Sequence, residues 1–98
     1  MNTPIKVLVV EDQAVVRQGL VAILSFYDEI EVIGEATNGI EAVNMVRELR
    51  PNVVLLDLVM PVQDGLETIP QILDVAPGTN ILIVTGYGEA DNIFSAIK

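Results

Sequence analysis

The sequence predicts an α/β fold in which a doubly wound parallel sheet is covered by helices on both faces. Short β-branched apolar runs alternate along the chain with segments whose apolar residues recur every three or four positions. The central runs are apolar at nearly every position, which is typical of strands buried on both faces. The 98 residues are 51% hydrophobic, so they suffice for one domain with a buried core.

The first strand is expected at residues 5–10, and a helix follows it. Asp12 stands at the expected N-cap of this helix, where a short acidic side chain accepts a hydrogen bond from a free backbone amide. Residues 26–29 break the helical period, and residues 31–36 form the second predicted strand. The apolar face of the first helix consists of Val16, Leu20, Ile23 and Leu24.

The second helix is predicted at residues 40–49, with an apolar face that repeats every three or four residues. Arg47 and Arg50 lie at its end, where cations favour the helix dipole, and Pro51 stops it. The following strand, residues 52–57, is continuously apolar until it ends on an aspartate.

A third helix with a weaker pattern contains Pro70, which we expect in its first turn, where the missing amide has no partner to lose. The fourth strand is predicted at residues 81–85 and a fourth helix at residues 89–97. The apolar face of the third helix consists of Leu66, Ile69, Ile72 and Leu73.

Composition excludes several classes of function. Fourteen acidic residues against five Lys and Arg give a net charge of −9, so direct binding of this segment to nucleic acid is not expected. The absence of histidine and cysteine excludes Ser-His and Cys-His catalysis and thiolate metal sites. No apolar run approaches membrane-spanning length and no signal peptide precedes the first strand, so a cytoplasmic protein without a membrane segment is expected.

Three acids and one hydroxyl stand where predicted strands end: Glu11, Asp12, Asp57 and Thr85. The carboxyl ends of parallel strands meet at one edge of a sheet, so these groups are expected to converge. Crowded carboxylates repel one another and offer the hard oxygen ligands that Mg²⁺ prefers. With Mg²⁺ bound, Asp57 can act as a nucleophile toward a phosphoryl group. Simpler interpretations remain open, with Asp12 as a helix cap and Thr85 as an ordinary β-branched residue ending a strand.

These residues carry a resemblance to a known family. The acidic pair at residues 11–12, the strand ending at Asp57, the segment Met60-Pro61-x-x-Asp64-Gly65 and the strand ending at Thr85 resemble the receiver domain of two-component response regulators. The resemblance covers the whole chain, and it implies a flavodoxin-like fold with strand order 2-1-3-4. Residues 32–36 and 38–39 are similar to the LuxR/NarL-type branch, which implies a DNA-binding output and a role in transcription regulation.

The resemblance also implies roles for individual residues. Asp57 is expected to accept a phosphoryl group from a sensor histidine kinase. Glu11, Asp12 and Asp57 would bind Mg²⁺ together with the backbone carbonyl of Val59, and Thr85 would be the switch hydroxyl. The chain would then be a signalling switch and not an enzyme, apart from its self-catalysed phosphorylation and dephosphorylation.

The sequence departs from the family pattern at its end. We expect residues 1–98 to form an incomplete receiver domain, without the fifth strand, the fifth helix, the lysine that pairs with the phosphoryl group, and an output domain. Lys98 lies on the predicted fourth helix and does not replace that lysine. The apolar strand at residues 81–85 would then be a sheet edge, so we expect either self-association through it and through helix 89–97 or a longer natural chain of which this segment is a part. The expected partner surface on that helix consists of Ile93, Phe94 and Ile97.

Alternatives from other classes also explain parts of the pattern. A pseudo-receiver would keep the fold and bind partners without phosphorylation, and the missing lysine favours it. A haloacid-dehalogenase-type phosphatase needs a second aspartate two residues after the nucleophile, where this sequence has Val59. A dinucleotide site would use Gly86 and Gly88, but the third glycine position holds Asp91.

Overall fold

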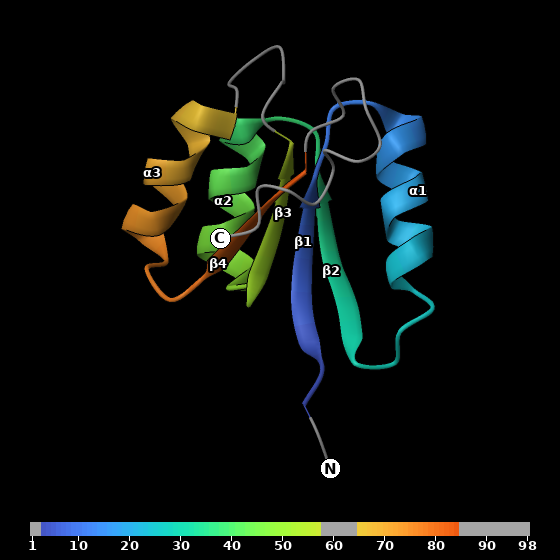
Figure 1. The fold of residues 1–98 in the computed structure, drawn as a ribbon. Helices are drawn as coiled ribbons and strands as arrows, with labels where there is room; N and C mark the ends of the chain where they lie inside the picture. The colour runs from blue at the N-terminus through green and yellow to red at the C-terminus, as the bar shows by residue number, and fades with distance from the viewer. Residues whose placement is uncertain (1–2, 58–64, 85–98) are drawn as a thin grey trace.

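The computed structural model describes residues 3–57 and 65–84, which form four parallel strands and three helices (Figure 1). The strand order is β2-β1-β3-β4, which confirms the predicted doubly wound sheet. The expected fourth helix, residues 89–97, lies outside the described residues. The elements in chain order are β1 (Ile5–Val10), α1 (Ala14–Leu24), β2 (Ile30–Ala36), α2 (Gly39–Leu49), β3 (Val53–Asp57), α3 (Gly65–Val75) and β4 (Asn80–Val84).

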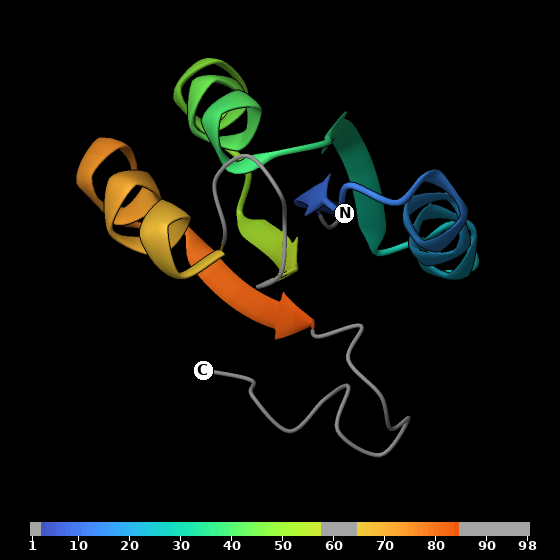
Figure 2. The ribbon, with the colours of Figure 1, turned by 90° about the horizontal axis from the view of Figure 1, so that it is seen from above.

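Helices lie on both faces of the sheet. Seen from above, α2 and α3 cover one face of the sheet and α1 covers part of the other (Figure 2). Alternate residues of β1 follow this division, since Leu8 and Val10 belong to the core under α2 and α3 while Val7 and Val9 belong to the core under α1. The predicted burial of the central strands on both faces is therefore confirmed.

The start of α1 differs from the prediction. Gln13 occupies the N-cap position without a side-chain capping bond, and the helix begins at Ala14. The amide of Gln13 instead donates to Oε2 of Glu11 at 2.9 Å. Asp12 is not the cap because its carboxylate lies in an acidic group at the end of the sheet. The predicted apolar face is also shifted, since Ile23 is exposed and Val21 packs on the core with Leu20 and Leu24.

The boundaries of α2 agree with the sequence signals to within one residue. Asn38 caps the helix, because its Oδ1 accepts a hydrogen bond of 2.8 Å from the amide of Glu41. Arg50 ends the helix in the left-handed conformation, with φ 52°, directly before Pro51.

The expected position of Pro70 was wrong. The third helix begins at Gly65, so Pro70 lies in its interior and not in its first turn. Proline has no amide to donate to the carbonyl four residues earlier, that of Leu66, and both residues are exposed. The buried face is shifted as well, since Thr68 and Ile72 are fully buried while Leu66 and Leu73 are exposed.

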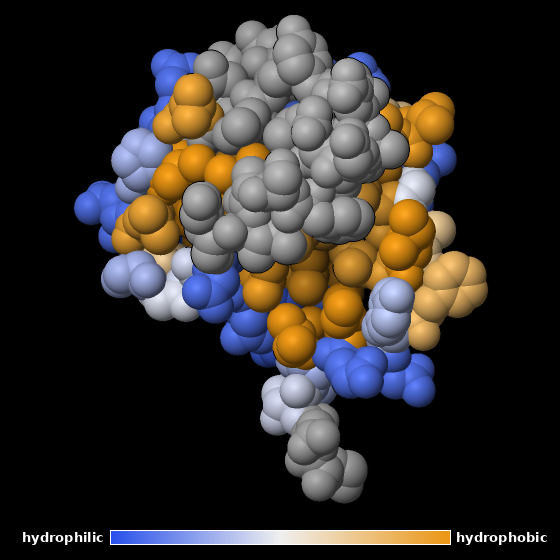
Figure 3. All heavy atoms as spheres, in the orientation of Figure 1, coloured by the Kyte–Doolittle hydropathy of each residue, from blue (hydrophilic) through white to orange (hydrophobic). Residues whose placement is uncertain are grey.

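One region of the sheet surface under α1 stays open among the described residues. In Figure 3, apolar atoms gather on this face below the residues drawn in grey. A hollow there has an entirely apolar lining, and β4 pairs only with β3 in the described part of the chain. The residues that line the hollow are Ile5, Val7, Leu24, Ile30, Val53, Leu55 and Leu82.

Candidate metal and phosphoryl site

The sheet topology brings two acidic residues to one edge. Strands β1 and β3 are neighbours, and Val10 pairs in register with Leu56. Glu11 directly follows β1, and Asp57 is the last residue of β3. Because the two strands are parallel, both acids emerge at the carboxyl edge of the sheet, as predicted.

The three predicted acids form one compact group. Glu11, Asp12 and Asp57 each offer a carboxylate oxygen, and these oxygens all lie within 4.8 Å of one another. Glu11 is only 3% exposed and Asp57 only 7%, while Asp12 is half-buried. Two of the three carboxylates are therefore withdrawn from water and face each other at short range.

This crowding perturbs the ionisation of Glu11. Burial is the largest cause and raises the pKa of Glu11 to about 7, and the nearby charge of Asp57 and hydrogen bonds with Asp57 and Asp12 act in the same direction. The hydrogen bond from the Gln13 amide opposes the shift. The three carboxylates therefore repel one another when they are ionised, and a bound cation would offset that repulsion.

The donor set suits a hard divalent cation. All three side chains present oxygen, and their spacing allows one ion to contact all of them. Burial raises the pKa of Glu11, the neighbouring Asp57 and Asp12 add to this effect, and a cation bound among the three carboxylates would act in the opposite direction. These residues can hold a metal ion.

The other predicted site residues lie outside the described part of the chain. They are Val59, with its backbone carbonyl, Thr85, and the partner surface Ile93, Phe94 and Ile97. Their predicted roles stay predictions.

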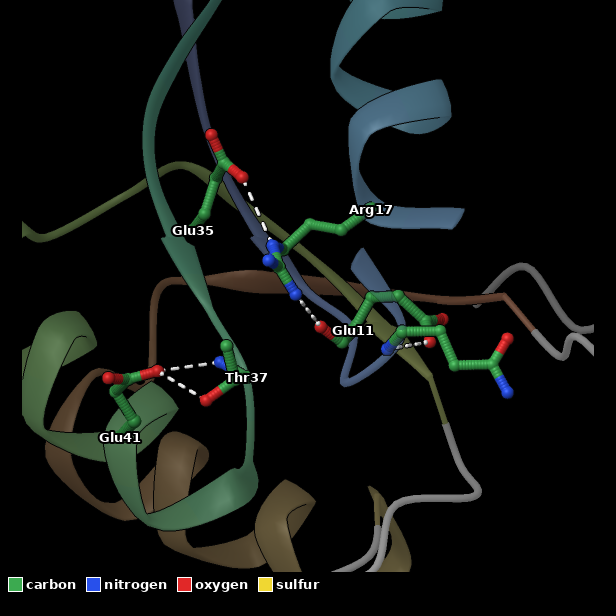
Figure 4. A network of polar contacts seen from close by, with 6 residues as sticks. Glu11, Arg17, Glu35, Thr37 and Glu41 are labelled. Carbon is green, nitrogen blue, oxygen red and sulfur yellow. Dashed lines mark hydrogen bonds and ion pairs between the residues drawn. The ribbon is translucent and has the colours of Figure 1, made fainter. Parts of the chain in front are cut away.

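Two residues beside the acids were not singled out from the sequence. Arg17 lies in α1, and its guanidinium reaches the backbone carbonyl of Glu11 on one side and the carboxylate of Glu35 on the other (Figure 4). No motif marked this pair, because the two residues belong to different elements. The isolated arginine in the first helix was the one available signal.

Comparison with known proteins identifies the family. The family model of the response regulator receiver domain matches residues 7–98. The chain belongs to this family, in agreement with its sheet order and with the acidic group at the sheet edge.

Two similar relatives are transcriptional regulatory proteins. The chain is 38% identical to the transcriptional regulatory protein YhcZ and 40% identical to the transcriptional regulatory protein LiaR, both of Bacillus subtilis, over 95% and 96% of its own length. It spans 44% of the length of each. It also matches protein-glutamate methylesterases, of which it covers only about a quarter, such as 26% of the enzyme of Paramagnetospirillum magneticum.

Solved structures show the same fold. The response regulator domain of Thermotoga maritima CheB superposes with a TM-score of 0.82 at 35% identity, covering 90% of this chain and 65% of that one. The receiver domain of NarL from Mycobacterium tuberculosis has a TM-score of 0.82 at 29% identity, covering 92% and 73%. A LuxR-family regulator from Aurantimonas also has a TM-score of 0.82, at 27% identity over 91% of this chain and 64% of that one, which agrees with the predicted branch.

None of the helices in residues 3–57 and 65–84 has both the length and the apolar character needed to cross a bilayer.

Proposed function

We propose that this chain is the phospho-accepting receiver domain of a two-component response regulator, with Asp57 as the acceptor. The observation that carries the proposal is the position of Asp57. It ends a buried central strand, and its carboxylate lies beside those of Glu11 and Asp12. The match to the receiver-domain family supports the same role.

The proposed reaction is transfer of a phosphoryl group from a phosphohistidine of a sensor kinase. A carboxylate oxygen of Asp57 attacks phosphorus, a P–O bond forms, and the P–N bond to the imidazole breaks. The bonding electron pair leaves with the imidazole nitrogen, which takes up a proton. The carboxylate of Asp57 must be ionised for the attack.

Mg²⁺ is the proposed cofactor. Glu11, Asp12 and Asp57, with the backbone carbonyl of Val59, would hold it. When bound, the ion supplies positive charge that offsets the negative charge on the transferring oxygens. Glu11 and Asp12 would serve only as ligands, whereas Asp57 would be both a ligand and the nucleophile.

The proposed output is a changed surface. Phosphorylation replaces the single negative charge of the Asp57 carboxylate with a phosphoryl group that carries about two, and the Thr85 hydroxyl would turn to bond the new oxygens. The face with Ile93, Phe94 and Ile97 would contact the partner. YhcZ and LiaR are named as transcriptional regulatory proteins, so the proposed downstream partner is a DNA-binding output domain. The chain itself would be a cytoplasmic switch and not an enzyme that processes a metabolite.

Intact mass after incubation with acetyl phosphate and Mg²⁺ tests this proposal. We expect the parent chain to gain the mass of one phosphoryl group and the Asp57→Asn variant to gain none. A parent chain that binds Mg²⁺ but gains no mass would overturn the acceptor role and favour the pseudo-receiver alternative. Modification of both proteins would place the acceptor elsewhere.

Self-association through β4 is part of the same proposal for this 98-residue chain. Among the described residues, β4 is the last strand of the sheet, and it carries no charged residue. Light scattering at increasing concentration should show mass rising above that of the monomer. A constant monomer mass would contradict it.

A further inference from the structure

Arg17, in α1, bonds both Glu11, which follows β1, and Glu35, which lies in β2. Its Nη1 donates to the backbone carbonyl of Glu11 at 2.8 Å, and its Nε donates to Oε1 of Glu35 at 3.1 Å (Figure 4). The arginine side chain is only 16% exposed, against 44% for the glutamate. This ion pair is therefore held more tightly than an ordinary surface pair, in which both long side chains move freely.

The register of β2 explains why Glu35 reaches Arg17. Val7 pairs with Val32, but the next residue of β1, Leu8, pairs with Gly34, so Ile33 is left without a partner on β1. Such a bulge moves every later side chain of the strand to the opposite face. It turns Glu35 toward the face covered by α1, in register with Val9, which belongs to the core under that helix.

The bond from Arg17 controls the backbone at the acids. The Glu11 carbonyl and the Asp12 amide share one planar peptide unit, so fixing the carbonyl orients the backbone from which both side chains leave. The amide of Glu11 is also fixed, since it donates to the carbonyl of Ala36 at 3.0 Å. The backbone of Glu11 is thus held by β2 on one side and by α1 on the other.

We propose that Arg17, oriented by Glu35, is a positioning residue that holds Glu11 and Asp12 in the geometry needed to share a metal ion with Asp57. Arg17 acts through the main chain of Glu11 and through the side chain of Glu35. The inference rests on the proposed metal site. Groups that orient metal ligands in this way typically change metal affinity by tenfold or more when they are removed.

Electrostatics and positioning predict opposite results for Arg17→Ala. Removal of a positive charge near three carboxylates should by itself strengthen the binding of a divalent cation. Loss of positioning should weaken it. The sign of the change in Mg²⁺ affinity therefore separates the two effects.

The experiment is calorimetric titration of Mg²⁺ into the full chain and its variants at one pH and ionic strength. We expect Arg17→Ala to raise the Mg²⁺ dissociation constant about tenfold. Arg17→Lys should recover part of the affinity, because an ammonium group can bond the Glu11 carbonyl but lacks the planar fork that also reaches Glu35. Glu35→Ala, which leaves the arginine in place, should weaken binding in the same direction.

Arg47→Ala is the matched control. Arg47 lies on α2, and its side chain bonds Asn44 at 3.4 Å, away from the acids. This substitution removes the same positive charge as Arg17→Ala and should leave the Mg²⁺ affinity unchanged or slightly stronger. Thermal unfolding of each variant shows whether it folds, and Arg17→Lys and Glu35→Ala carry the test if Arg17→Ala does not.

The outcomes separate the inference from the proposed function. If the parent chain fails to bind Mg²⁺, the metal site itself is wrong. If the parent binds Mg²⁺ and the folded Arg17 and Glu35 variants bind it equally well or more tightly, the site stands and the positioning role is overturned.

Discussion

The carboxylates of Glu11 and Asp57 face each other at the ends of adjacent parallel strands, and both are withdrawn from water. Burial, together with the charge of Asp57, raises the pKa of Glu11 to about 7. The chain thus uses part of its folding free energy to hold two acids together. The proposed phosphoryl-transfer site, in which these acids would hold a cation, would account for that arrangement.

Replacement of Glu11 by glutamine should stabilise the metal-free protein. Glutamine keeps an oxygen to accept from the Gln13 amide and removes the repulsion with Asp57, so above pH 7, where Glu11 is ionised, we expect a gain of about 1 kcal/mol in the free energy of unfolding. Urea unfolding of the parent chain and of Glu11→Gln, both in the presence of a chelator, measures this difference in free energy. A loss of stability of the same size would contradict the inferred repulsion between Glu11 and Asp57.

Magnesium should narrow this difference in stability between the parent chain and Glu11→Gln. At ten times its dissociation constant, Mg²⁺ should add about 1.4 kcal/mol to the parent chain. Glu11→Gln has lost one ligand and should gain less at the same concentration. Equal shifts in melting temperature for both proteins, measured with and without Mg²⁺, would exclude Glu11 from the metal site.

The raised pKa of Glu11 predicts a pH dependence in metal-free protein. Folding raises this pKa from 4.5 to about 7, so between these values the folded state holds a proton that the unfolded state has lost. The contribution of Glu11 to stability is present below pH 4.5 and falls as pH rises toward 7. The stability difference between the parent and Glu11→Gln should therefore widen in favour of the variant over this range. A difference that does not change with pH would rule out the raised pKa.

Close packing at the bulge of β2 predicts a large effect of a small substitution. A Cβ atom at Gly34 would lie 2.8 Å from Cε of Met45 and 3.1 Å from Cδ1 of Leu8. We expect Gly34→Ala to cost about 1–2 kcal/mol through overpacking. The flexible end of Met45 is the nearest atom, so Met45→Ala in the same chain should reduce this cost. Additive effects of the two substitutions in chemical denaturation would argue against the contact.

The buried face of α3 can be tested with two alanine substitutions. Ile72 is fully buried, and Leu66 on the same helix is 68% exposed. Ile72→Ala should destabilise the protein by about 2–4 kcal/mol, and Leu66→Ala by less than about 1 kcal/mol. Similar costs for the two variants would show that the helix is rotated from its described position.

The sequence contained enough to predict the sheet and the meeting of the acids. Alternating strand and helix patterns predicted the parallel order, and the positions of Glu11, Asp12 and Asp57 directly after or at the end of strands predicted their convergence. Parallel topology alone predicts that the three acids converge, because the carboxyl ends of parallel strands lie at one edge of the sheet whatever the individual side-chain contacts are.

Other features depend on tertiary structure and were missed. The pairing of Arg17 with Glu35 depends on the bulge at Ile33, which a regular alternation of faces does not predict. Asp12 suits a helix cap locally, but the acidic group outweighs that preference. The interior position of Pro70 is tolerated because it lies on the solvent side of α3, which periodicity alone did not show.

The most direct test of the central claim is to map the acyl phosphate itself. The chain is treated with acetyl phosphate and Mg²⁺, reduced with borohydride, which converts an aspartyl phosphate to homoserine, and digested for peptide mass analysis. The account predicts homoserine at position 57 in samples containing Mg²⁺ and none in samples with chelator. Homoserine at position 12, or equal conversion of Asp57 without a divalent cation, would contradict it.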